Sequence, residues 1–510
     1  VLFRSPAAMR VVDFVDKVRI NPGNFVDKRA QFKVIEYDDA SYAAEIEKIE
    51  EKFTPLVEKC KKLKRAMRIG VNHGSLSDRI MNRYGDTPAG MVESAFEFTR
   101  IARKLDYHEI IFSMKSSNPL VMIEAYRLLA QELDKQGWDY PLHLGVTEAG
   151  LGEDGRIKSA IGIGSLLLDG IGDTIRVSLT EDPWYEIDPC NRLKKFAEQK
   201  NVSVSYQTFA PRETRYNHLS LYKGGTVAIK LTESEQNDPK LFSKLGFDEV
   251  LGQPKIKASA ADIIIVDKVV AREKLKKLAD IGVSVLSEKS DADFPSIKSP
   301  KEVLFGASSP LVVRTSQEIP AKKCDLILFE ADDLLSKGRT FYESLSDNAP
   351  VIWVHKSKNE MDDVVIEASS ELGSLLCDGA GIGILLENDL PLEDRVRLSF
   401  NILQASRRRI IKTDFISCPS CGRTLFDLQS VTLRIREKTA HLPGVKIAIM
   451  GCIVNGPGEM ADADFGYVGS KPGKIDLYIG KTCVEKDIEF DHADGRLIEL
   501  IKNQGKWVDP

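Results

Sequence analysis

The feature that most constrains this fold is the alternation of short apolar strands with longer helical patterns over the first 190 residues. Strands that alternate with helices form parallel sheets built from βα units. Most of the strands run into polar or glycine-containing turns, at the end where a (β/α)8 barrel keeps its chemistry. The predicted strands are residues 17–20, 67–71, 110–114, 142–146 and 174–179, and the clearest helices are 43–63, 88–104 and 119–136.

Five βα units are present in this region, whereas a closed barrel needs eight. The sequence starts at Val1 without an initiator Met, and it opens on a helical pattern. We therefore interpret residues 1–189 as a partial (β/α)8 TIM barrel whose first three βα units are missing from an N-terminally truncated sequence. An open five-stranded sheet of the doubly wound type is the alternative, and spacing alone does not distinguish the two.

A second α/β region follows at residues 190–398, and it predicts an inserted TIM-like barrel. Few of its strands end in charged or Asn/Gly clusters, so we expect a spacer without an obvious active site. A short internal echo supports common ancestry, because the segment 165–172 (SLLLDGIG) resembles 374–381 (SLLCDGAG). The strand candidates are 227–231, 262–266, 283–286, 311–314, 326–329 and 351–355.

The last block, residues 399–510, reads as a C-terminal α+β domain that carries clustered cysteines. Cys418 and Cys421 form a C-x2-C motif, and Cys452 follows a predicted strand at 446–450. Glu459 lies seven residues farther on, beyond a glycine-rich turn. Two thiolates at C-x2-C spacing can bind one metal centre from a single turn.

Three interpretations of this motif stay open on spacing alone. The first is a zinc site, with Cys483 or a His as the fourth ligand. The second is a thioredoxin-like dithiol. The third is an iron–sulfur cluster held by three thiolates and one other ligand. A carboxylate in that fourth place would be the easiest ligand to displace, because a hard oxygen binds weakly where soft sulfur is preferred.

The first region also carries cations at or near the ends of its strands, where side chains from several strands of one barrel can converge. Guanidinium groups bind phosphate oxygens bidentately, and a lysine adds a point charge. A surface salt bridge explains any one of them, but four at equivalent places favour a polyanion site. Glu148 is an acid–base candidate there, or a partner of Arg176; His73 and His143 lie near the same edge. The cations are Arg19, Arg68, Lys115 and Arg176, with Asn21, Asn72 and Ser178 nearby.

Composition narrows the class of protein. The 510 residues include 71 basic and 76 acidic ones, for a net charge of −5 and no basic block, so nucleic-acid binding is not indicated. The apolar runs are too short to cross a bilayer, so no membrane role is expected. Eight cysteines in this length do not make a disulfide scaffold. Two rival functions remain: a zinc-stabilised phosphosugar-binding or isomerase barrel, and a non-catalytic scaffold.

Several motifs resemble those of the 4-hydroxy-3-methylbut-2-en-1-yl diphosphate synthases. The likeness spans nearly the whole chain, and the tandem of cysteine and Glu-bearing motifs is highly specific. The inserted region resembles that of the large form of the family, in which a second barrel separates the two functional domains. The matching segments are CPSCGRTLFD (418–427), MGCIVNGPGE (450–459), RINPGN (19–24), RIGVN (68–72), HLGVTEAG (143–150), KSAIGIG (158–164) and DTIRVSL (173–179).

The resemblance implies an oxidoreductase of the methylerythritol phosphate route to isoprenoids. It implies reductive ring opening and dehydroxylation of 2-C-methyl-D-erythritol 2,4-cyclodiphosphate, with ferredoxin or flavodoxin as the electron donor. It also implies a [4Fe-4S] cluster on Cys418, Cys421, Cys452 and Glu459, and a catalytic role for Glu148 as well as Glu459. A homodimer, and either the bacterial cytosol or the plastid stroma, are compatible with it. The implied substrate-binding residues are Arg19, Asn21, Arg68, Asn72, Lys115, Arg176 and Ser178.

Overall fold

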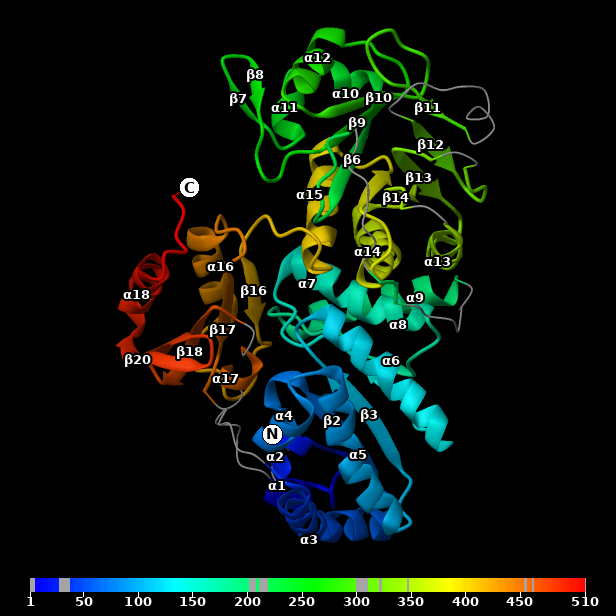
Figure 1. Ribbon diagram of the computed structural model, residues 1–510. Coiled ribbons are helices and arrows are strands. Elements are labelled where there is room, and N and C mark those ends of the chain that lie inside the picture. Colours follow the sequence, from blue (N-terminus) through cyan, green and yellow to red (C-terminus); the bar gives the residue numbers. More distant parts are fainter. Residues whose placement is uncertain are drawn as a thin grey trace. The chain divides into compact units, whose positions relative to one another are not determined.

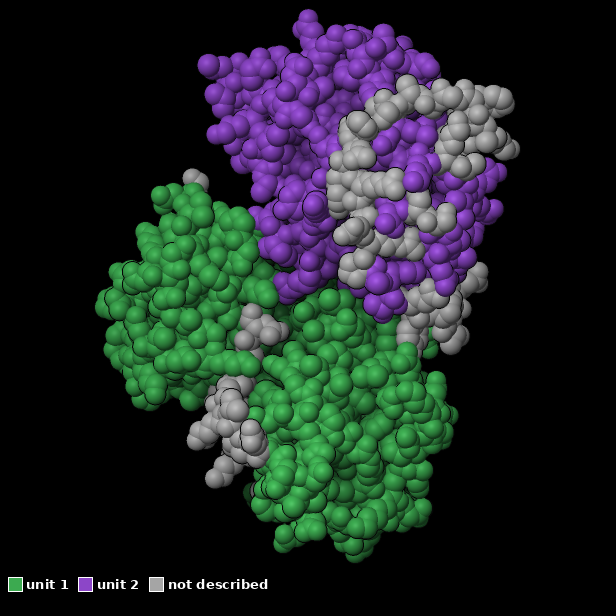
Figure 2. All heavy atoms as spheres, viewed as in Figure 1, with its two compact units in different colours: residues 1–191, 412–510 green, residues 192–411 purple. Residues whose placement is uncertain are grey.

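The structure is a computed structural model, and it forms two compact units (Figures 1 and 2). One unit contains residues 1–191 and 412–510, and the other contains residues 192–411, so the second unit is inserted into the sequence of the first. Among the described residues, no helix combines the length and apolar character needed to cross a membrane. The described residues are 5–26, 37–200, 208–210, 219–299, 311–320, 323–345, 348–453, 456–460 and 463–509.

The N-terminal part of the first unit contains five parallel strands in chain order. The first three pair side by side, a bridge between Phe112 and Leu142 joins the third to the fourth, and the fourth pairs with the fifth. The alternation predicted from the sequence is therefore confirmed for all five strands. The strands are β1 (Lys17–Ile20), β2 (Ala66–Asn72), β3 (Ile110–Lys115), β4 (His143–Leu144) and β5 (Thr174–Ile175).

Local sequence signals explain where the main helices of this part begin. Thr87 and Asn118 cap two of them with side-chain oxygens, and a proline stands in the first turn of each, where no amide hydrogen bond is lost. These two helices have the bounds predicted from the sequence. The helices are α1 (Ser5–Val11), α2 (Pro22–Phe25), α3 (Asp39–Leu63), η1 (His73–Ser75), α4 (Asp78–Tyr84), α5 (Pro88–Lys104), α6 (Pro119–Gln136), α7 (Gly152–Ser159), η2 (Ala160–Gly164), α8 (Ser165–Leu168), η3 (Pro183–Glu186) and α9 (Ile187–Glu198).

The second unit is built on an eight-stranded parallel sheet that is nearly closed into a barrel. Its strands are neighbours in chain order, the last pairs with the first, and a bridge from Ser287 to Ser296 links the two edges. The strands are β6 (Thr226–Leu231), β9 (Ile263–Val266), β10 (Ser284–Ser287), β11 (Ile297–Lys298), β12 (Val312–Thr315), β13 (Leu326–Glu330), β14 (Val351–Lys356) and β15 (Gly383–Glu387).

Apolar side chains such as Ile265, Leu328 and Ile352 form a buried cluster on these strands. Outside the sheet, a hairpin pairs two further strands. The hairpin strands are β7 (Asp248–Val250) and β8 (Gln253–Lys255), and the helices are α10 (Glu233–Asn237), α11 (Leu241–Lys244), α12 (Arg272–Asp280), α13 (Leu334–Ser344), α14 (Met361–Cys377) and α15 (Leu392–Ala405).

The second barrel has few charged clusters along its sequence, as expected, but its single charges gather at one end of the sheet. It carries charged side chains at the carboxyl ends of its strands, including Arg314, Glu330 and Glu387, and these line a cavity. Each strand contributes only one or two charges, so no cluster stands out along the sequence. Closure of the sheet brings the single charges together.

The internal echo corresponds to the same buried ion pair in both units. Asp169 accepts a hydrogen bond from Arg127 at 2.9 Å, and Asp378 accepts one from Arg339 at 2.8 Å. In each case the aspartate follows a helix and the arginine comes from the preceding helix of that unit. The shared packing supports the repeat that the sequence indicates.

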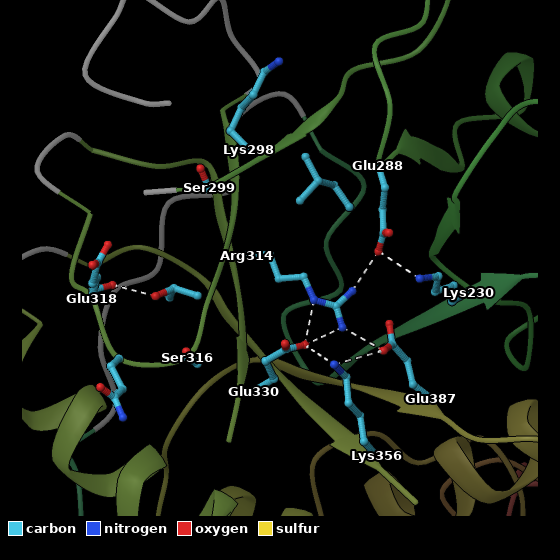
Figure 3. A pocket seen from close by; sticks show the side chains of 13 residues that line it. Lys230, Glu288, Lys298, Ser299, Arg314, Ser316, Glu318, Glu330, Lys356 and Glu387 are labelled. Carbon is cyan, nitrogen blue, oxygen red and sulfur yellow. Dashed lines mark hydrogen bonds and ion pairs between the residues drawn. The ribbon is translucent and has the colours of Figure 1, made fainter. Parts of the chain in front are cut away.

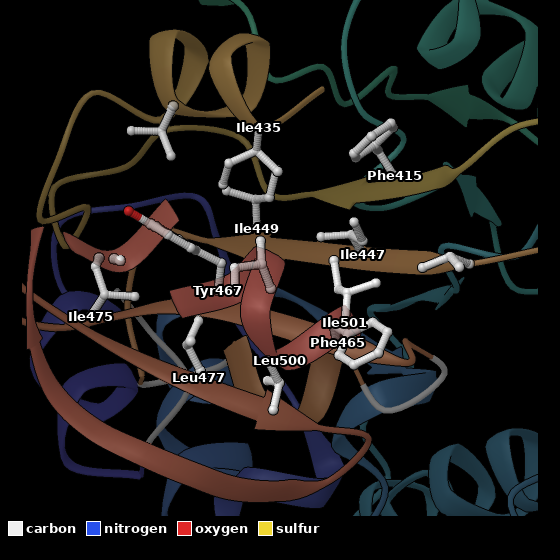
Figure 4. Close-up of a cluster of buried hydrophobic side chains, with 14 of the residues drawn as sticks. Phe415, Ile435, Ile447, Ile449, Phe465, Tyr467, Ile475, Leu477, Leu500 and Ile501 are labelled. Atoms are coloured by element: carbon white, nitrogen blue, oxygen red, sulfur yellow. The ribbon is translucent and has the colours of Figure 1, made fainter. Parts of the chain in front are cut away.

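The C-terminal part of the first unit is a mixed five-stranded sheet covered by helices. Its first three strands are parallel and its last two are antiparallel to their neighbours. Side chains such as Ile447, Tyr467 and Leu500 form its buried core (Figure 4). The elements are β16 (Asp414–Ser417), α16 (Leu428–Thr439), β17 (Lys446–Met450), α17 (Gly456–Glu459), β18 (Phe465–Lys471), β19 (Lys474–Ile479), β20 (Thr482–Glu489) and α18 (Phe490–Asn503).

Candidate active site

The four cations predicted from the sequence come together in the first unit. Arg19 and Arg68 stand opposite each other in the register of β1 and β2. Lys115 ends β3 and Arg176 follows β5, and the charges of all three arginines lower the pKa of Lys115. We call this group, Arg19, Arg68, Lys115 and Arg176, the first mouth.

Burial is the largest cause of the low pKa of Lys115. The residue is 5% exposed, and its ammonium Nζ has no hydrogen-bond partner among the described residues. Gly145 makes room for it, because a Cβ there would lie 2.7 Å from Nζ. Burial also lowers the pKa of Arg68, and it lowers that of Arg19 to about 10. Buried like charges repel one another, so this arrangement favours an anionic ligand.

The polar companions of these cations have different surroundings. Asn21 is buried, donates to Ser75 Oγ at 2.8 Å and accepts from the amide of Gly23. Ser178 Oγ lies 3.4 Å from Arg176 Nη2. These contacts hold both residues at the edge where the cations lie.

The two histidines near this edge bind protein groups. His73 lies 3.0 Å from an oxygen of Asp86, and His143 Nδ1 lies 2.8 Å from Thr174 Oγ1. Burial, with the nearby cations, lowers the pKa of His143 to about 3. His143 is therefore neutral near pH 7.

Glu148 occupies a strained position beside the first mouth. Its φ of 48° lies in the left-handed region, which non-glycine residues seldom adopt. The side chain is 4% exposed, and Oε2 has no hydrogen-bond partner among the described residues. Burial raises the pKa of Glu148 well above its usual value, and the charge of Glu459 raises it further. A raised pKa favours the protonated carboxyl group, which can act as an acid.

The C-terminal domain brings Glu459 to this same place. Asn72 donates a hydrogen bond from Nδ2 to Glu459 Oε1 at 2.9 Å. Burial raises the pKa of Glu459, while a hydrogen bond from Glu148 and the charge of Arg19 oppose the rise. Residues more than 380 positions apart in the sequence therefore form one buried polar group.

Two glycines allow this close approach. A Cβ on Gly74 would lie 2.3 Å from Gly458 O, and a Cβ on Gly458 would lie 2.2 Å from Gly74 O. Any side chain at either position would push η1 and α17 apart. The glycines therefore let the loop that carries Glu459 reach the strand end that carries Asn72.

Further contacts hold the C-terminal domain against the N-terminal part. Lys158 Nζ donates to Asp414 Oδ1 at 2.7 Å and to Phe415 O at 3.0 Å, and all of these groups are buried. Thr180 Oγ1 lies 2.6 Å from Ser417 Oγ, just before the C-x2-C motif. A buried ion pair with its hydrogen bonds satisfied fixes the register of the two parts.

The cysteines of the C-terminal motifs lie beside the same polar group. The amide of Gly451 donates to Cys418 Sγ at 3.4 Å, and burial raises the pKa of the Cys418 thiol. The charges of Glu459 and Cys452 raise it further, so these ligand candidates lie near one another. Among the described residues, no three His, Cys, Asp or Glu side chains converge as they would around a single ion.

Sequence reasoning missed the part played by Arg423. The charge and hydrogen bonds of Arg423 lower the pKa of the Cys421 thiol, and its charge also opposes the raised pKa of Glu459. Thr424 Oγ1 accepts the amide of Cys421 at 3.0 Å. The signal was present in the sequence, because both residues directly follow the C-x2-C motif.

Comparisons with known proteins place both parts of the first unit. Residues 1–191 match the GcpE TIM-barrel domain, and residues 414–503 match the GcpE protein C-terminal domain. The chain is 56% identical to "4-hydroxy-3-methylbut-2-en-1-yl diphosphate synthase (flavodoxin)" of Protochlamydia amoebophila, over 100% of this chain and 84% of that protein. It is 48% identical to the chloroplastic, ferredoxin-named synthase of Arabidopsis thaliana, over 100% of this chain and 77% of the relative. The flavodoxin-named synthase of Chlamydia pneumoniae is 45% identical, with 100% and 83% covered.

Proposed function

This chain belongs to the 4-hydroxy-3-methylbut-2-en-1-yl diphosphate synthase family, and we propose that the buried group formed by Asn72, Glu148 and Glu459 is the centre of its active site. The enzyme converts 2-C-methyl-D-erythritol 2,4-cyclodiphosphate into 4-hydroxy-3-methylbut-2-enyl diphosphate in the methylerythritol phosphate pathway. In this reaction two electrons open the ring, and a hydroxyl group leaves as water.

The first mouth binds the diphosphate of the substrate. The ammonium of Lys115 is buried without a hydrogen-bond partner among the described residues. Burying an unpaired ammonium group is unfavourable, and a bound anion offsets that free-energy cost. Arg68 and Arg176 add guanidinium groups that suit phosphate oxygens. Arg19, Asn21, Asn72 and Ser178 complete the proposed substrate-binding set.

Cys418, Cys421, Cys452 and Glu459 hold a [4Fe-4S] cluster. The donor set fits this group, because three soft thiolates with one hard carboxylate suit an iron–sulfur centre that keeps one exchangeable position. Each ligand of such a cluster binds a different iron, so the four side chains do not converge on one point. When bound, the cluster supplies electrons to the substrate one at a time.

The protein groups around the substrate then have separate tasks. Glu148 is the proton donor, because burial raises the pKa of its carboxyl group and so favours the protonated form. Asn72 holds Glu459 by a hydrogen bond and so orients that carboxylate. The packed backbones of Gly74 and Gly458 exclude water from this side of the site.

We assign the remaining parts of the chain in the same proposal. The substrate barrel spans residues 1–189, the inserted TIM-like spacer domain 190–398 and the cluster domain 399–510. Helix α9 spans the first of these boundaries and α15 spans the second, and the two compact units divide after residues 191 and 411. The electron donor is a flavodoxin or a ferredoxin, as in the names of the relatives. A homodimer, and either the bacterial cytosol or the plastid stroma, are compatible with the proposal.

The hydrogen bond from Asn72 to Glu459 is the observation that most supports this proposal, because it joins the two functional domains at the reacting centre. The test is anaerobic purification followed by iron and sulfide assays and by turnover with reduced flavodoxin. We expect about four irons and four sulfides per chain, since a cubane cluster contains four of each. One zinc per chain, with no iron and no turnover, would contradict the proposal.

A further inference from the structure

The carboxyl ends of the strands in the eight-stranded barrel carry a second polar site. A cavity of about 740 Å³ opens there, within the size range of small-molecule sites (Figure 3). In barrels of this kind, the carboxyl ends of the strands are where ligands bind. We call this group the second mouth; it consists of Lys230, Glu288, Arg314, Glu330, Lys356 and Glu387.

Arg314 lies at the centre of the second mouth, and three carboxylates surround its guanidinium. Its Nη1 donates to Glu288 at 2.8 Å, its Nε to Glu330 at 2.7 Å and its Nη2 to Glu387 at 2.7 Å (Figure 3). The side chain is 18% exposed. These acidic neighbours come from three different strand ends, so the guanidinium links those three ends through its hydrogen bonds.

The two lysines complete the charge balance. Lys230 lies 3.0 Å from Glu288, and Lys356 lies 2.9 Å from Glu330. Within the second mouth, three cations therefore face three carboxylates, and each cation has at least one carboxylate partner. Lys230 also pairs with Asp267 at 2.7 Å, and the cavity wall adds one further charge of each sign, Lys298 and Glu318. An anionic ligand would have to displace these carboxylates from Arg314, while an apolar ligand would strip water from the charged groups without replacing its hydrogen bonds.

Unused hydrogen-bonding capacity points to a different ligand. Glu387 Oε1 is buried and has no hydrogen-bond partner among the described residues. An ionised carboxylate is an acceptor only, so this oxygen requires a donor. Ser316 and Gln317 add neutral donors and acceptors to the same cavity wall. A hydroxyl group can donate to Glu387 and accept from Ser316 and the lysines.

We propose that the second mouth binds an uncharged polyhydroxylated small molecule, such as a sugar or polyol. Such a ligand supplies many donors and acceptors, carries no charge to unbalance the ion pairs, and fits the volume of the cavity. The site lies in a different unit from the first mouth, and it shares no residue with the proposed diphosphate-binding set.

The test is saturation-transfer NMR on the full chain with meso-erythritol, D-ribose and myo-inositol as probes, and with inorganic phosphate as competitor. We expect saturation transfer to at least one polyol, unaffected by phosphate. Glu387→Gln should weaken it about tenfold, because the oxygen that accepts the hydroxyl loses its charge. Glu393→Gln, which removes a carboxylate from the exposed face of α15, should leave it unchanged.

Lys356→Gln is a second variant at the exposed rim of the cavity. It keeps the test decisive if Glu387→Gln does not fold. We expect a weaker signal in this variant with an unchanged circular dichroism spectrum. The proposal is overturned if no probe gives a signal, if phosphate abolishes the signal, or if both folded rim variants bind like the unmodified chain.

Discussion

The two mouths of this protein lie at equivalent ends of parallel strands, yet the cations in them have opposite surroundings. In the first mouth, Lys115 is buried without a hydrogen-bond partner among the described residues. In the second mouth, Arg314 has three carboxylates around it. The comparison shows that the partners of a cation at a strand end indicate its role, whereas its position alone does not.

The two arrangements also differ in their electrostatic cost. Burial and, after it, repulsion from the neighbouring arginines lower the pKa of Lys115 in the first mouth. A protein retains such a group where a ligand supplies the missing charge. The charges of the second mouth pair with one another within the chain, so that site favours neutral ligands.

The largest expected effect concerns the cluster ligands beside the first mouth. Cys452→Ser should lower the iron content and reduce turnover at least about 100-fold, because a hard hydroxyl replaces a soft thiolate. The measurements are iron and sulfide per chain after anaerobic purification, and turnover with reduced flavodoxin. Cys483→Ser is the matched control, since that thiol lies in the same domain and its Sγ lies 3.5 Å from the carbonyl oxygen of Glu485. Equal iron loss in both variants would refute the assignment.

Next in size is the loss of one cation from the first mouth. Arg68→Met should raise the KM for the cyclodiphosphate about tenfold to a hundredfold, because a charged hydrogen bond to phosphate disappears. Arg434→Met is the control, since that arginine binds Asp494 on the C-terminal domain at 2.7 Å. Steady-state kinetics measure both. A KM that rises equally in the two variants would show that general charge, rather than the mouth, controls binding.

A smaller effect should follow from separating the two glycines. Gly74→Ala places a methyl group against Gly458 O, so we expect kcat/KM to fall about tenfold through displacement of Glu459. Gly495→Ala, in α18 with open space around it, should leave kcat/KM unchanged. The assay is kcat/KM together with the melting temperature. Unchanged kinetics in a folded Gly74→Ala protein would mean that the close approach is dispensable.

The smallest effect concerns stability in the second unit. Burial raises the pKa of Glu371 from 4.5 to about 7, although the charge of Lys200, 2.6 Å away, opposes the rise. The charges of Asp333 and Glu367 raise this pKa further. His355 lies beside Glu371 and stays neutral, because burial lowers the pKa of its imidazole to about 3. The folded state therefore holds this proton more tightly than the unfolded chain does. The stabilisation that this bound proton gives to the folded state is complete below pH 4.5 and is lost as the pH rises through 7.

Glu371→Gln cannot ionise, so its free energy of unfolding should depend less on pH between 4.5 and 7 than that of the unmodified chain. Chemical denaturation at a series of pH values measures this difference. Glu343→Gln, on α13, serves as the control for loss of one acidic residue. A pH dependence that is identical in all three proteins would exclude Glu371 as its source.

Much of the fold could be predicted from the sequence. The strand at Lys17–Ile20 and the helices at Pro88–Lys104 and Pro119–Gln136 have the predicted bounds, because apolar periodicity and proline-bearing caps are local signals. The convergence of Arg19, Arg68, Lys115 and Arg176 was also predicted, since parallel strands bring equivalent positions to one edge.

Other features depend on distant contacts and had no local signal. The approach of Gly74 to Gly458 joins segments far apart in the sequence, and nothing in either segment specifies the partner. The second mouth was missed for the same reason, because its charges stand singly on strands that only the closed sheet brings together.

Isothermal titration of the full chain with 2-C-methyl-D-erythritol 2,4-cyclodiphosphate tests the central claim most directly, when run above neutral pH in buffers of different ionisation enthalpy. An anion that pairs with Lys115 raises its lowered pKa, so binding should take up protons. We predict one site per chain with proton uptake that disappears in Lys115→Met. Binding without proton uptake, or equal uptake in Lys115→Met, would contradict the claim that the buried lysine of the first mouth awaits the diphosphate.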